Sequence, residues 1–430
     1  MNKEILRLAI PNIISNISVP LLSTVDTALM GRLSAAHVGA VGLGVMVFNL
    51  VYWNFGFLRM GTTGITAQAF GSRDDAASIL TLGRALLVAL LLAALVLLLQ
   101  VPLGQLSFYL MHVLPEQYGL ISEYYYIRIW AAPATLGLYA FMGWFFGMQN
   151  AIYPLLLTIF INVVNIAFSF LFIVYYGMDV DGVAWGTVIA QYAGFLLAFI
   201  LFALRYRPLL QRLQRRALLE LKAFKQFLLI NRDIFIRTVC LTFVFAFFYR
   251  QSSGGGETIL AVNIILQQFI SWMSYGVDGF AYASESLVGK YKGAADQPKL
   301  HRAIRLSFVW GMVLAALYSL SFWLFDRPLL AIFTDQAELI DASLPYIPWV
   351  VLLPLVATPC YLWDGIFVGL TASRAMRDCM LLSLLVFLLA FYTLDIFLAN
   401  HGLWLALTIF MVARGGLQWL WFKKKGLAIY

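Results

Sequence analysis

The chain has 430 residues, of which 62% are hydrophobic and 12% charged, and its mean hydropathy is +0.85. A water-soluble domain of this length has no room to bury so much apolar surface, so we predict an all-α polytopic membrane protein. A transmembrane barrel would show short alternating segments instead of long apolar runs. The net charge of +8 does not indicate a nucleic-acid partner, because basic residues in membrane proteins report orientation and no stretch combines a basic groove with stacking aromatics.

Charged or turn-rich breaks divide the chain into twelve predicted spans. They cover residues 6–31, 38–68, 79–102, 119–147, 153–176, 182–204, 227–250, 258–289, 303–325, 340–370, 378–399 and 402–422. With the N-terminus in the cytoplasm, most Lys and Arg residues fall into cytoplasmic segments, and the even number of spans returns the C-terminus to that side. We therefore expect a multi-pass membrane protein with both termini cytoplasmic. The first apolar run is too long for a cleavable signal peptide.

One long basic connection, residues 205–226, separates the first six spans from the last six. It predicts an N-lobe of residues 1–204 and a C-lobe of residues 227–430. The Arg-rich face of the connection is typical of a surface that meets lipid headgroups or water.

An internal repeat supports the same division. The segment 71–74 (Gly-Ser-Arg-Asp) recurs as 293–296 (Gly-Ala-Ala-Asp), and 143–147 (Gly-Trp-Phe-Phe-Gly) recurs as 365–369 (Gly-Ile-Phe-Val-Gly), both at an offset of 222 residues. Because each half has an even number of spans, both halves have the same orientation. We expect the two six-helix lobes to be related by a pseudo-twofold axis along the membrane normal.

The residues that could support an enzyme are scarce. No phosphate-binding loop of the Gly-x-x-x-x-Gly-Lys-Ser/Thr type occurs, and the four histidines show no metal-ligand spacing. Cys240, Cys360 and Cys379 lie in apolar segments and are interpreted as small core side chains. We therefore expect no catalytic residue, no metal and no cofactor.

Asp26 is the most informative residue, because it is the only acid in the apolar stretch 9–30. A charged carboxylate inside such a helix costs about 3 kcal/mol by insertion scales, so it usually faces a protein interior or a wet cavity and has a function. The alternative is an acid at a helix end that reaches the headgroups, since Arg32 follows closely.

Other polar residues lie within the predicted spans. In the N-terminal half, Asn162 and Asn165 share a helix face, and Ser169 and Thr187 are further candidates for a cavity. Amide side chains also join helices in lipid, and this alternative stays open for Asn162.

The C-terminal half contributes the acids Asp278, Glu285 and Asp364 as candidates for cation binding. Glu285 is expected to form a surface pair with Lys290. The cations Arg59 and Arg237 are expected to pair with acids at that depth, because an unpaired buried charge is costly.

Two prolines lie in the helix that carries Asp26. Pro11 and Pro20 both remove a backbone hydrogen bond, so this helix can bend there. A static kink is the alternative.

Several longer strings resemble a known family. The stretch 57–71 (Phe-Leu-Arg-Met-Gly-Thr-Thr-Gly-Ile-Thr-Ala-Gln-Ala-Phe-Gly) is similar to the second-helix motif of the multidrug and toxic compound extrusion (MATE) family, in its DinF-like branch. Residues 231–237, 261–266, 275–289 and 363–369 resemble further landmarks of that branch.

This resemblance implies a V-shaped, two-lobed antiporter that exports amphipathic, often cationic drugs against an inward flow of H⁺ or Na⁺. By position, Asp26 matches the first-helix carboxylate that family members protonate, and Pro11 matches the proline about which that helix bends. Asn165 and Thr187 match residues of the N-lobe cavity, and Asp364 matches a C-lobe acid used for cation coupling in some branches. We expect a monomer in the lipid bilayer.

The chain departs from the family at one position. Ser169 stands where many relatives have an acid, so the N-lobe site keeps one carboxylate, Asp26. Burial favours the neutral form of a carboxylate, so Asp26 can take up a proton near neutral pH. The hypothesis is therefore a proton-coupled multidrug exporter of a bacterial inner membrane. The alternatives are an exporter coupled to Na⁺ through the C-lobe acids, a lipid-intermediate flippase of the same superfamily, and a membrane-embedded enzyme.

Overall fold

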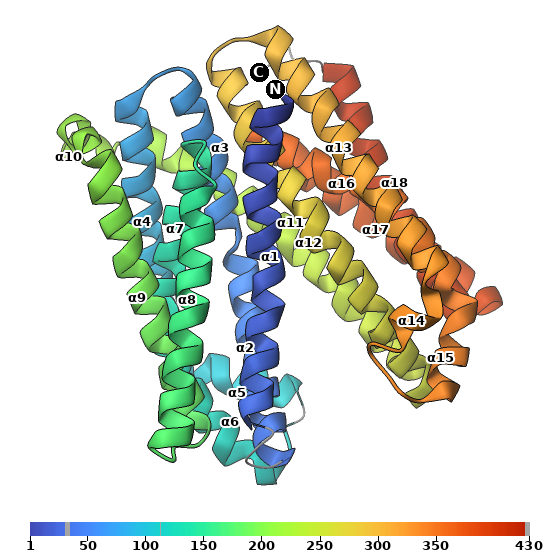
Figure 1. Ribbon diagram of the computed structural model, residues 1–430. Helices are drawn as coiled ribbons and strands as arrows, with labels where there is room; N and C mark the ends of the chain where they lie inside the picture. Colours follow the sequence, from blue (N-terminus) through green and yellow to red (C-terminus); the bar gives the residue numbers. More distant parts are fainter. Residues whose placement is uncertain (31–34, 112, 426–430) are drawn as a thin grey trace. The chain divides into compact units, whose positions relative to one another are not determined.

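The computed structural model describes the backbone of residues 1–30, 35–111 and 113–425. Side chains are described within these ranges except at 19–30, 35–36, 38, 215, 395–397 and 425. Every regular element in this part of the chain is a helix (Figure 1). The predicted all-α membrane fold is therefore confirmed.

Ten segments of the described chain are long and apolar enough to cross a membrane. They are Gly39–Gly71, Asp75–Leu98, Pro115–Gly147, Ile152–Tyr175, Val180–Arg212, Glu257–Gly293, Gln297–Leu324, Ala337–Gly369, Ser373–Leu394 and Asn400–Lys424. Each corresponds to one predicted span. The two remaining predicted spans, 6–31 and 227–250, fall on the long helices α1 (Asn2–Met30) and α11 (Leu221–Gly254).

The contacts within the chain group it into two compact units. The first comprises residues 14–228 and the second comprises residues 1–13 together with 229–430. In chain order, the first unit contains α2 (Ala35–Phe55), α3 (Phe57–Gly71), α4 (Asp75–Leu98), α5 (Gln100–Leu110), α6 (Pro115–Arg128), η1 (Ile129–Ala131), α7 (Ala132–Gly147), α8 (Ile152–Phe170), η2 (Leu171–Tyr175), α9 (Val180–Tyr206), η3 (Arg207–Arg212) and α10 (Arg215–Leu218). Helix α1 contributes to both units, and its first three turns group with the second.

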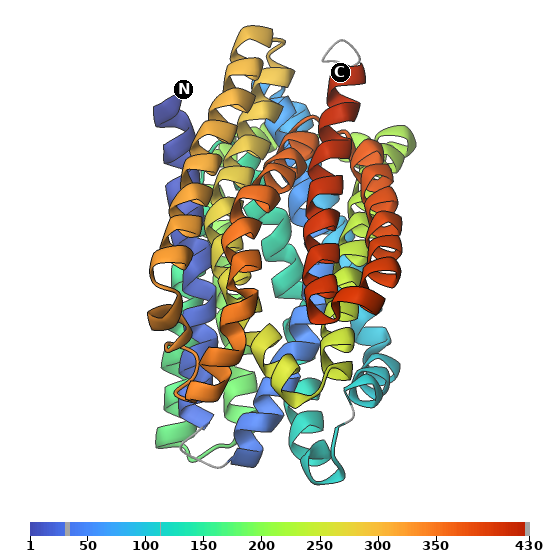
Figure 2. The same ribbon diagram turned by 90° about the vertical axis from the view of Figure 1, so that its right-hand side faces the viewer.

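The second unit contains most of α11 and the helices that follow it. They are α12 (Glu257–Gly293), α13 (Gln297–Leu324), α14 (Asp326–Leu330), α15 (Ala337–Ser343), η4 (Leu344–Tyr346), α16 (Ile347–Gly369), α17 (Ser373–Leu398) and α18 (Asn400–Lys425). Helices α17 and α18 pack side by side, as the orange-red and red ribbons of Figure 2 show. The predicted lobe limits at 204 and 227 stay a prediction.

The connection 205–226 is largely helical. Helix α9 runs to Tyr206, two short helical pieces follow (η3 and α10), and α11 begins at Leu221. The connection is therefore folded for most of its length.

The packing of four glycines confirms the internal repeat. A Cβ atom added at Gly143 would lie 2.4 Å from the carbonyl oxygen of Arg59, and one added at Gly365 would lie 2.2 Å from that of Ala281. Residues 59 and 281 are again 222 positions apart. Gly147 and Gly369 repeat the relation one turn later, against the carbonyl oxygens of residues 63 and 285. In both halves, glycine therefore allows two helices to approach at equivalent positions.

The turns between helices repeat as well. Asp74 and Asp296 both cap a helix N-terminus, each accepting a hydrogen bond from the backbone N–H three residues on (2.8 and 3.1 Å). The residue before each has a positive φ, 57° at Arg73 and 53° at Ala295. These shared conformations explain why the sequence similarity survives at these two turns.

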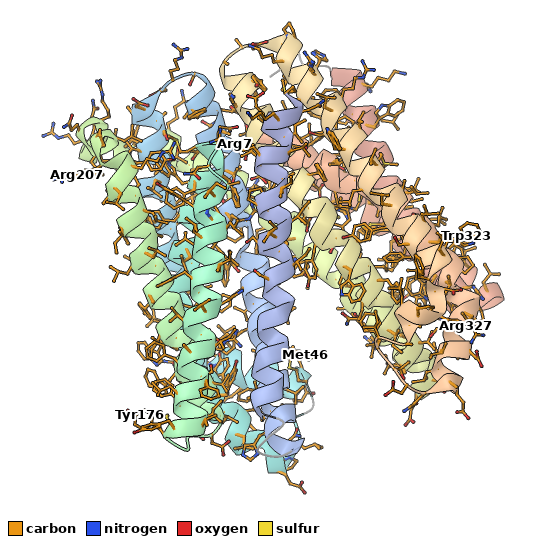
Figure 3. All side chains as sticks on the ribbon, in the orientation of Figure 1. Arg7, Met46, Tyr176, Arg207, Trp323 and Arg327 are labelled. Carbon is orange, nitrogen blue, oxygen red and sulfur yellow. The ribbon has the colours of Figure 1, made fainter. Side chains whose placement is uncertain are left out.

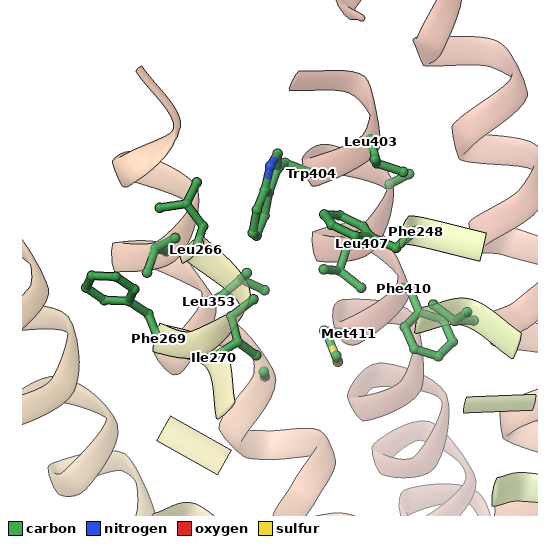
Figure 4. Packing of buried hydrophobic residues seen from close by; sticks show 14 of the residues in the cluster. Phe248, Leu266, Phe269, Ile270, Leu353, Leu403, Trp404, Leu407, Phe410 and Met411 are labelled. Carbon is green, nitrogen blue, oxygen red and sulfur yellow. The ribbon is translucent and has the colours of Figure 1, made fainter. Parts of the chain in front are cut away.

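Each unit has its own apolar core. In the second unit, Phe248, Phe269, Trp404 and Phe410 are among the buried residues of one cluster, which Figure 4 shows from close by. The outward surface is apolar too: large exposed side chains such as Met46 and Trp323 project away from the helices (Figure 3). Such a surface suits lipid and not water.

Candidate functional site

Asp26 and Pro20 lie in the helical backbone of α1, but their side chains are outside the described residues. The structural evidence on this site therefore comes from residues of α1, α8 and α9 whose side chains are described. Pro11 is described and buried, and α1 continues as a helix through it.

A line of polar contacts joins α1 to α8. The hydroxyl of Ser15 donates to Thr158 Oγ1 at 2.9 Å, and one turn further along both helices the Nδ2 atom of Asn162 donates to the carbonyl oxygen of Ser18 at 3.2 Å. Asn162 therefore does join two helices, which was the alternative kept open for it.

Asn165 and Thr187 continue this line between α8 and α9. The Nδ2 atom of Asn165 donates to Thr187 Oγ1 at 2.9 Å, and Thr187 donates to the carbonyl oxygen of Val183 at 3.0 Å. Asn165 is buried, yet its Oδ1 atom has no hydrogen-bond partner within the described part of the chain. A buried amide oxygen without a partner costs free energy unless a ligand, water or proton donor satisfies it.

Ser169 lies one turn beyond Asn165 on the same face of α8 and is fully buried. A Cβ atom added at Gly186 of α9 would lie 2.6 Å from Ser169 Oγ, so the two helices are in close contact here. An acid at position 169 would need more room than this contact leaves. The helix then changes to a π-helical turn, η2, a form that often occurs at functional sites.

The second unit holds a buried charge cluster on Asp364. Its Oδ2 atom accepts hydrogen bonds from Arg237 and from Arg414 Nη2, the latter at 2.7 Å, and its Oδ1 atom accepts one from Gln418 Nε2 at 2.7 Å. All four side chains are buried. The predicted pairing of Arg237 with a buried acid is confirmed.

The sequence analysis missed Arg414 and Gln418. Arg414 is the only charged residue in the predicted span 402–422, and that isolation was the signal that could have identified it.

The surface location predicted for Glu285 is wrong. Glu285 is buried where α12 packs on α16, since a Cβ atom added at Gly369 would lie 2.6 Å from its carbonyl oxygen. Lys290 donates a hydrogen bond to Glu4 Oε1 at 3.0 Å. Asp278 is partly buried on the same helix, α12.

Glu4 fastens the start of α1 to α12. Besides the bond from Lys290, its carboxylate accepts hydrogen bonds from the Tyr291 hydroxyl at 3.0 and 3.1 Å and lies 3.3 Å from the N-terminal ammonium of Met1. Burial alone would raise the pKa of Glu4, but the donors Lys290 and Tyr291 hold that pKa below its ordinary value.

Close backbone packing strengthens this attachment. A Cβ atom added at Gly279 of α12 would lie 2.3 Å from Ile13 Cγ1 and 3.0 Å from the carbonyl oxygen of Ala9. Within the second unit, the first turns of α1 are therefore held at their start and again at Ala9 and Ile13.

Among the residues that the structure describes, no group of three or more His, Cys, Asp or Glu side chains is placed to hold a metal ion.

Comparisons with known proteins agree with this architecture. The MatE family model matches residues 11–171 and 234–398. The chain is 35% identical over 420 residues to DNA damage-inducible protein F of Escherichia coli, covering 96% of this chain and 90% of the relative. It is 24% identical over 356 residues to the probable multidrug resistance protein NorM of Thermotoga maritima, covering 80% and 74% of the two chains.

Among solved structures, an outward-facing multidrug resistance MATE family transporter of the MOP superfamily superposes with a TM-score of 0.87 at 19% identity, covering 98% of this chain and 95% of the other. At that identity the superposition shows the shared fold. The family match covers both halves of the repeat, and the homologues are transporters, not enzymes. The chain therefore belongs to the MATE family of multi-pass efflux transporters, in its DinF-like branch.

Proposed function

We propose that this transporter exports amphipathic or cationic drugs in exchange for protons, and that Asp26 carries the proton. The observation that supports this most is the line of polar contacts along α1, α8 and α9. It includes Ser15, Asn162, Asn165 and Thr187, and it ends at Asn165 Oδ1, an acceptor without a described partner.

Helix geometry brings position 26 of α1 to this line. At 100° per residue, positions 15, 18 and 26 fall within an arc of about 80° on α1. Position 26 is also about 12 Å beyond position 18, while Ser169 of α8 is about 10 Å beyond Asn162. The contacts at 15–158 and 18–162 run in the same direction along both helices, so backbone position 26 reaches the level of Ser169.

The proposed cycle uses one carboxylate. Deprotonated Asp26 attracts a cationic or hydrogen-bonding drug, and protonation from the outer side discharges the site and releases the drug. The proton then leaves to the cytoplasm as the lobes change their access, and α1 bends in the region of Pro11 and Pro20. Pro11 supports this step, because it lies two residues before the point where α1 passes from one compact unit to the other.

The charge cluster on Asp364 favours protons over sodium. A sodium ion needs several oxygen ligands, whereas both carboxylate oxygens of Asp364 already accept hydrogen bonds. Two of these three hydrogen bonds come from guanidinium groups. The positive charges of Arg237 and Arg414 would also repel a sodium ion. Asp278 and Glu285 remain the cation candidates of that half.

Drug/proton exchange by the Asp26→Asn variant tests the proposal. We expect purified Asp26→Asn in proteoliposomes to give no drug-driven collapse of a pH gradient, because an amide does not titrate. The wild-type protein should give the same rate with and without Na⁺. The Asp364→Asn variant is measured in the same proteoliposome assay to test the second unit, and size-exclusion chromatography verifies that each variant is folded. Retained exchange in Asp26→Asn would overturn the assignment of the proton site. An absolute need for Na⁺ would move the coupling to Asp278 or Glu285.

A further inference from the structure

The segment 204–225, here called the connector, is the most basic surface of the first unit. Its exposed side chains include Arg205, Arg207, Arg212, Arg216, Lys222 and Lys225, against one exposed acid, Glu220. Arg207 projects outward from the end of the helices in Figure 3. A row of like charges is costly to hold together unless a counter-charge is present.

The connector is fixed in place by α4. Arg84 donates hydrogen bonds through Nη2 to the carbonyl oxygen of Ala217 at 2.7 Å and through Nε to that of Leu218 at 3.2 Å. The Leu218 side chain packs on Gly83, where an added Cβ atom would lie 2.6 Å from Leu218 Cδ1. Arginine thereby satisfies carbonyl groups that the short helix α10 leaves open.

This attachment fixes the level along α4 at which the connector lies. Arg84 lies nine residues into α4, which is roughly 14 Å along the helix axis, and it falls inside a segment apolar enough to span a membrane. The connector therefore folds back along α4 instead of extending away from the helix end. The connector therefore lies beside an apolar segment of α4.

The connector also exposes apolar residues, as expected for a segment at a membrane interface. Leu219 and Leu221 are 65% and 81% exposed, and Leu204 and Leu210 are exposed as well. Leucines beside arginines and lysines are typical of segments that lie in a membrane interface, with the apolar side chains in the acyl region and the cations at the phosphates.

We propose that the connector is a binding site for anionic phospholipid headgroups of the leaflet that it faces. Charge complementarity selects the occupant: phosphodiester groups neutralise the basic side chains, while the neighbouring leucines enter the acyl layer of the same lipids. The site belongs to the first unit alone and does not depend on which ion or drug the protein transports.

Lipid retention by the full-length protein tests this proposal directly. Native mass spectrometry of protein extracted from phosphatidylcholine vesicles that contain phosphatidylglycerol should detect retained phosphatidylglycerol. The variant Arg212→Gln/Arg216→Gln/Lys222→Gln should bind it at least about tenfold more weakly, since each basic residue near an anionic surface contributes. A matched control, Arg302→Gln/Arg305→Gln/Lys424→Gln, removes three exposed charges elsewhere and should retain the lipid.

A second variant separates the apolar contribution. Leu219→Ser/Leu221→Ser keeps every charge and should also weaken retention, while glycerol phosphate, which carries the charge without acyl chains, should not displace the lipid. Equal retention by the first variant and the wild type, or equal loss in the matched control, would overturn the proposal. Displacement by glycerol phosphate would assign the connector to a soluble anion instead.

Discussion

At the scale of single residues, glycines decide where helices of this protein can touch. Gly365 brings α16 against the backbone of α12, and Gly143 brings α7 against that of α3. At other glycines the space is open: a Cβ atom at Gly416 of α18 would meet nothing within 4 Å. The same residue type therefore has a packing role at some positions and none at others.

Alanine substitutions should separate these roles. We expect Gly365→Ala to lower the stability of the purified protein by about 1–3 kcal/mol, because the added methyl group forces the α12 and α16 backbones apart. Gly416→Ala should leave stability unchanged or raise it by up to about 1 kcal/mol, since alanine favours a helix. Thermal unfolding in detergent measures both. A Gly365→Ala protein as stable as Gly416→Ala would contradict the close contact.

At the scale of elements, α1 is the helix with a divided role. Its first turns are fastened to α12 through Glu4, Lys290 and Tyr291, and its later turns make polar contacts with α8. Pro11 lies near the end of the part of α1 that packs on α12, which extends to Ile13, and it lacks the N–H that would bond to the carbonyl oxygen of Arg7. A bend is therefore easier here than in an uninterrupted helix.

The attachment at Glu4 should depend on pH in a defined direction. Since its pKa is lower in the folded protein, the carboxylate stabilises the folded state above its ordinary pKa. That stabilisation is lost as the pH falls through the lowered value. The protection factors of the amides in the first turns of α1, which are corrected for the intrinsic pH dependence of exchange, should thus stay constant from neutral pH down to the ordinary carboxylate range and fall only below it.

The Glu4→Gln variant provides the control for that measurement. It should exchange faster than the wild type at neutral pH and show no acid transition of its own in these turns. An acid transition that persists in Glu4→Gln would assign the effect to another group.

At the scale of the whole molecule, the proposed coupling through one carboxylate would set the energetics of transport. One proton crossing about 100 mV supplies about 2.3 kcal/mol, and each pH unit adds about 1.4 kcal/mol. An electrogenic one-for-one exchange, as with a neutral drug, therefore sustains a drug gradient of a few hundredfold at one pH unit. Exchange of one proton for a monovalent cationic drug moves no net charge, so only the pH term of about tenfold remains.

The steady-state drug ratio across vesicles should follow that stoichiometry. At zero membrane potential we expect the ratio to change about tenfold for each unit of imposed pH difference. A change of about a hundredfold per unit would show two protons per drug and would require a second titrating group besides Asp26.

Much of this protein could be predicted from residue types in order along the chain. The apolar runs located the membrane spans, because a bilayer demands about twenty apolar residues in a helix whatever the neighbours are. The offset of 222 residues located the repeat, and the packing at Gly143 and Gly365 confirmed it. The family strings then identified a MATE transporter, and Ser169 marked the departure from its relatives.

Other features depended on contacts between residues far apart in sequence. The arginines on Asp364 come from α11 and α18, and Glu4 finds its partners in α12. Likewise, the connector 204–225 folds back because Arg84 of α4 holds it. Helix periodicity determines which face a residue occupies, but not which helix lies opposite. Residue types in order along the chain were therefore enough to predict the class, the spans and the family. Which charges pair, and where α1 and the connector are attached, depended on which helices face each other in the folded protein.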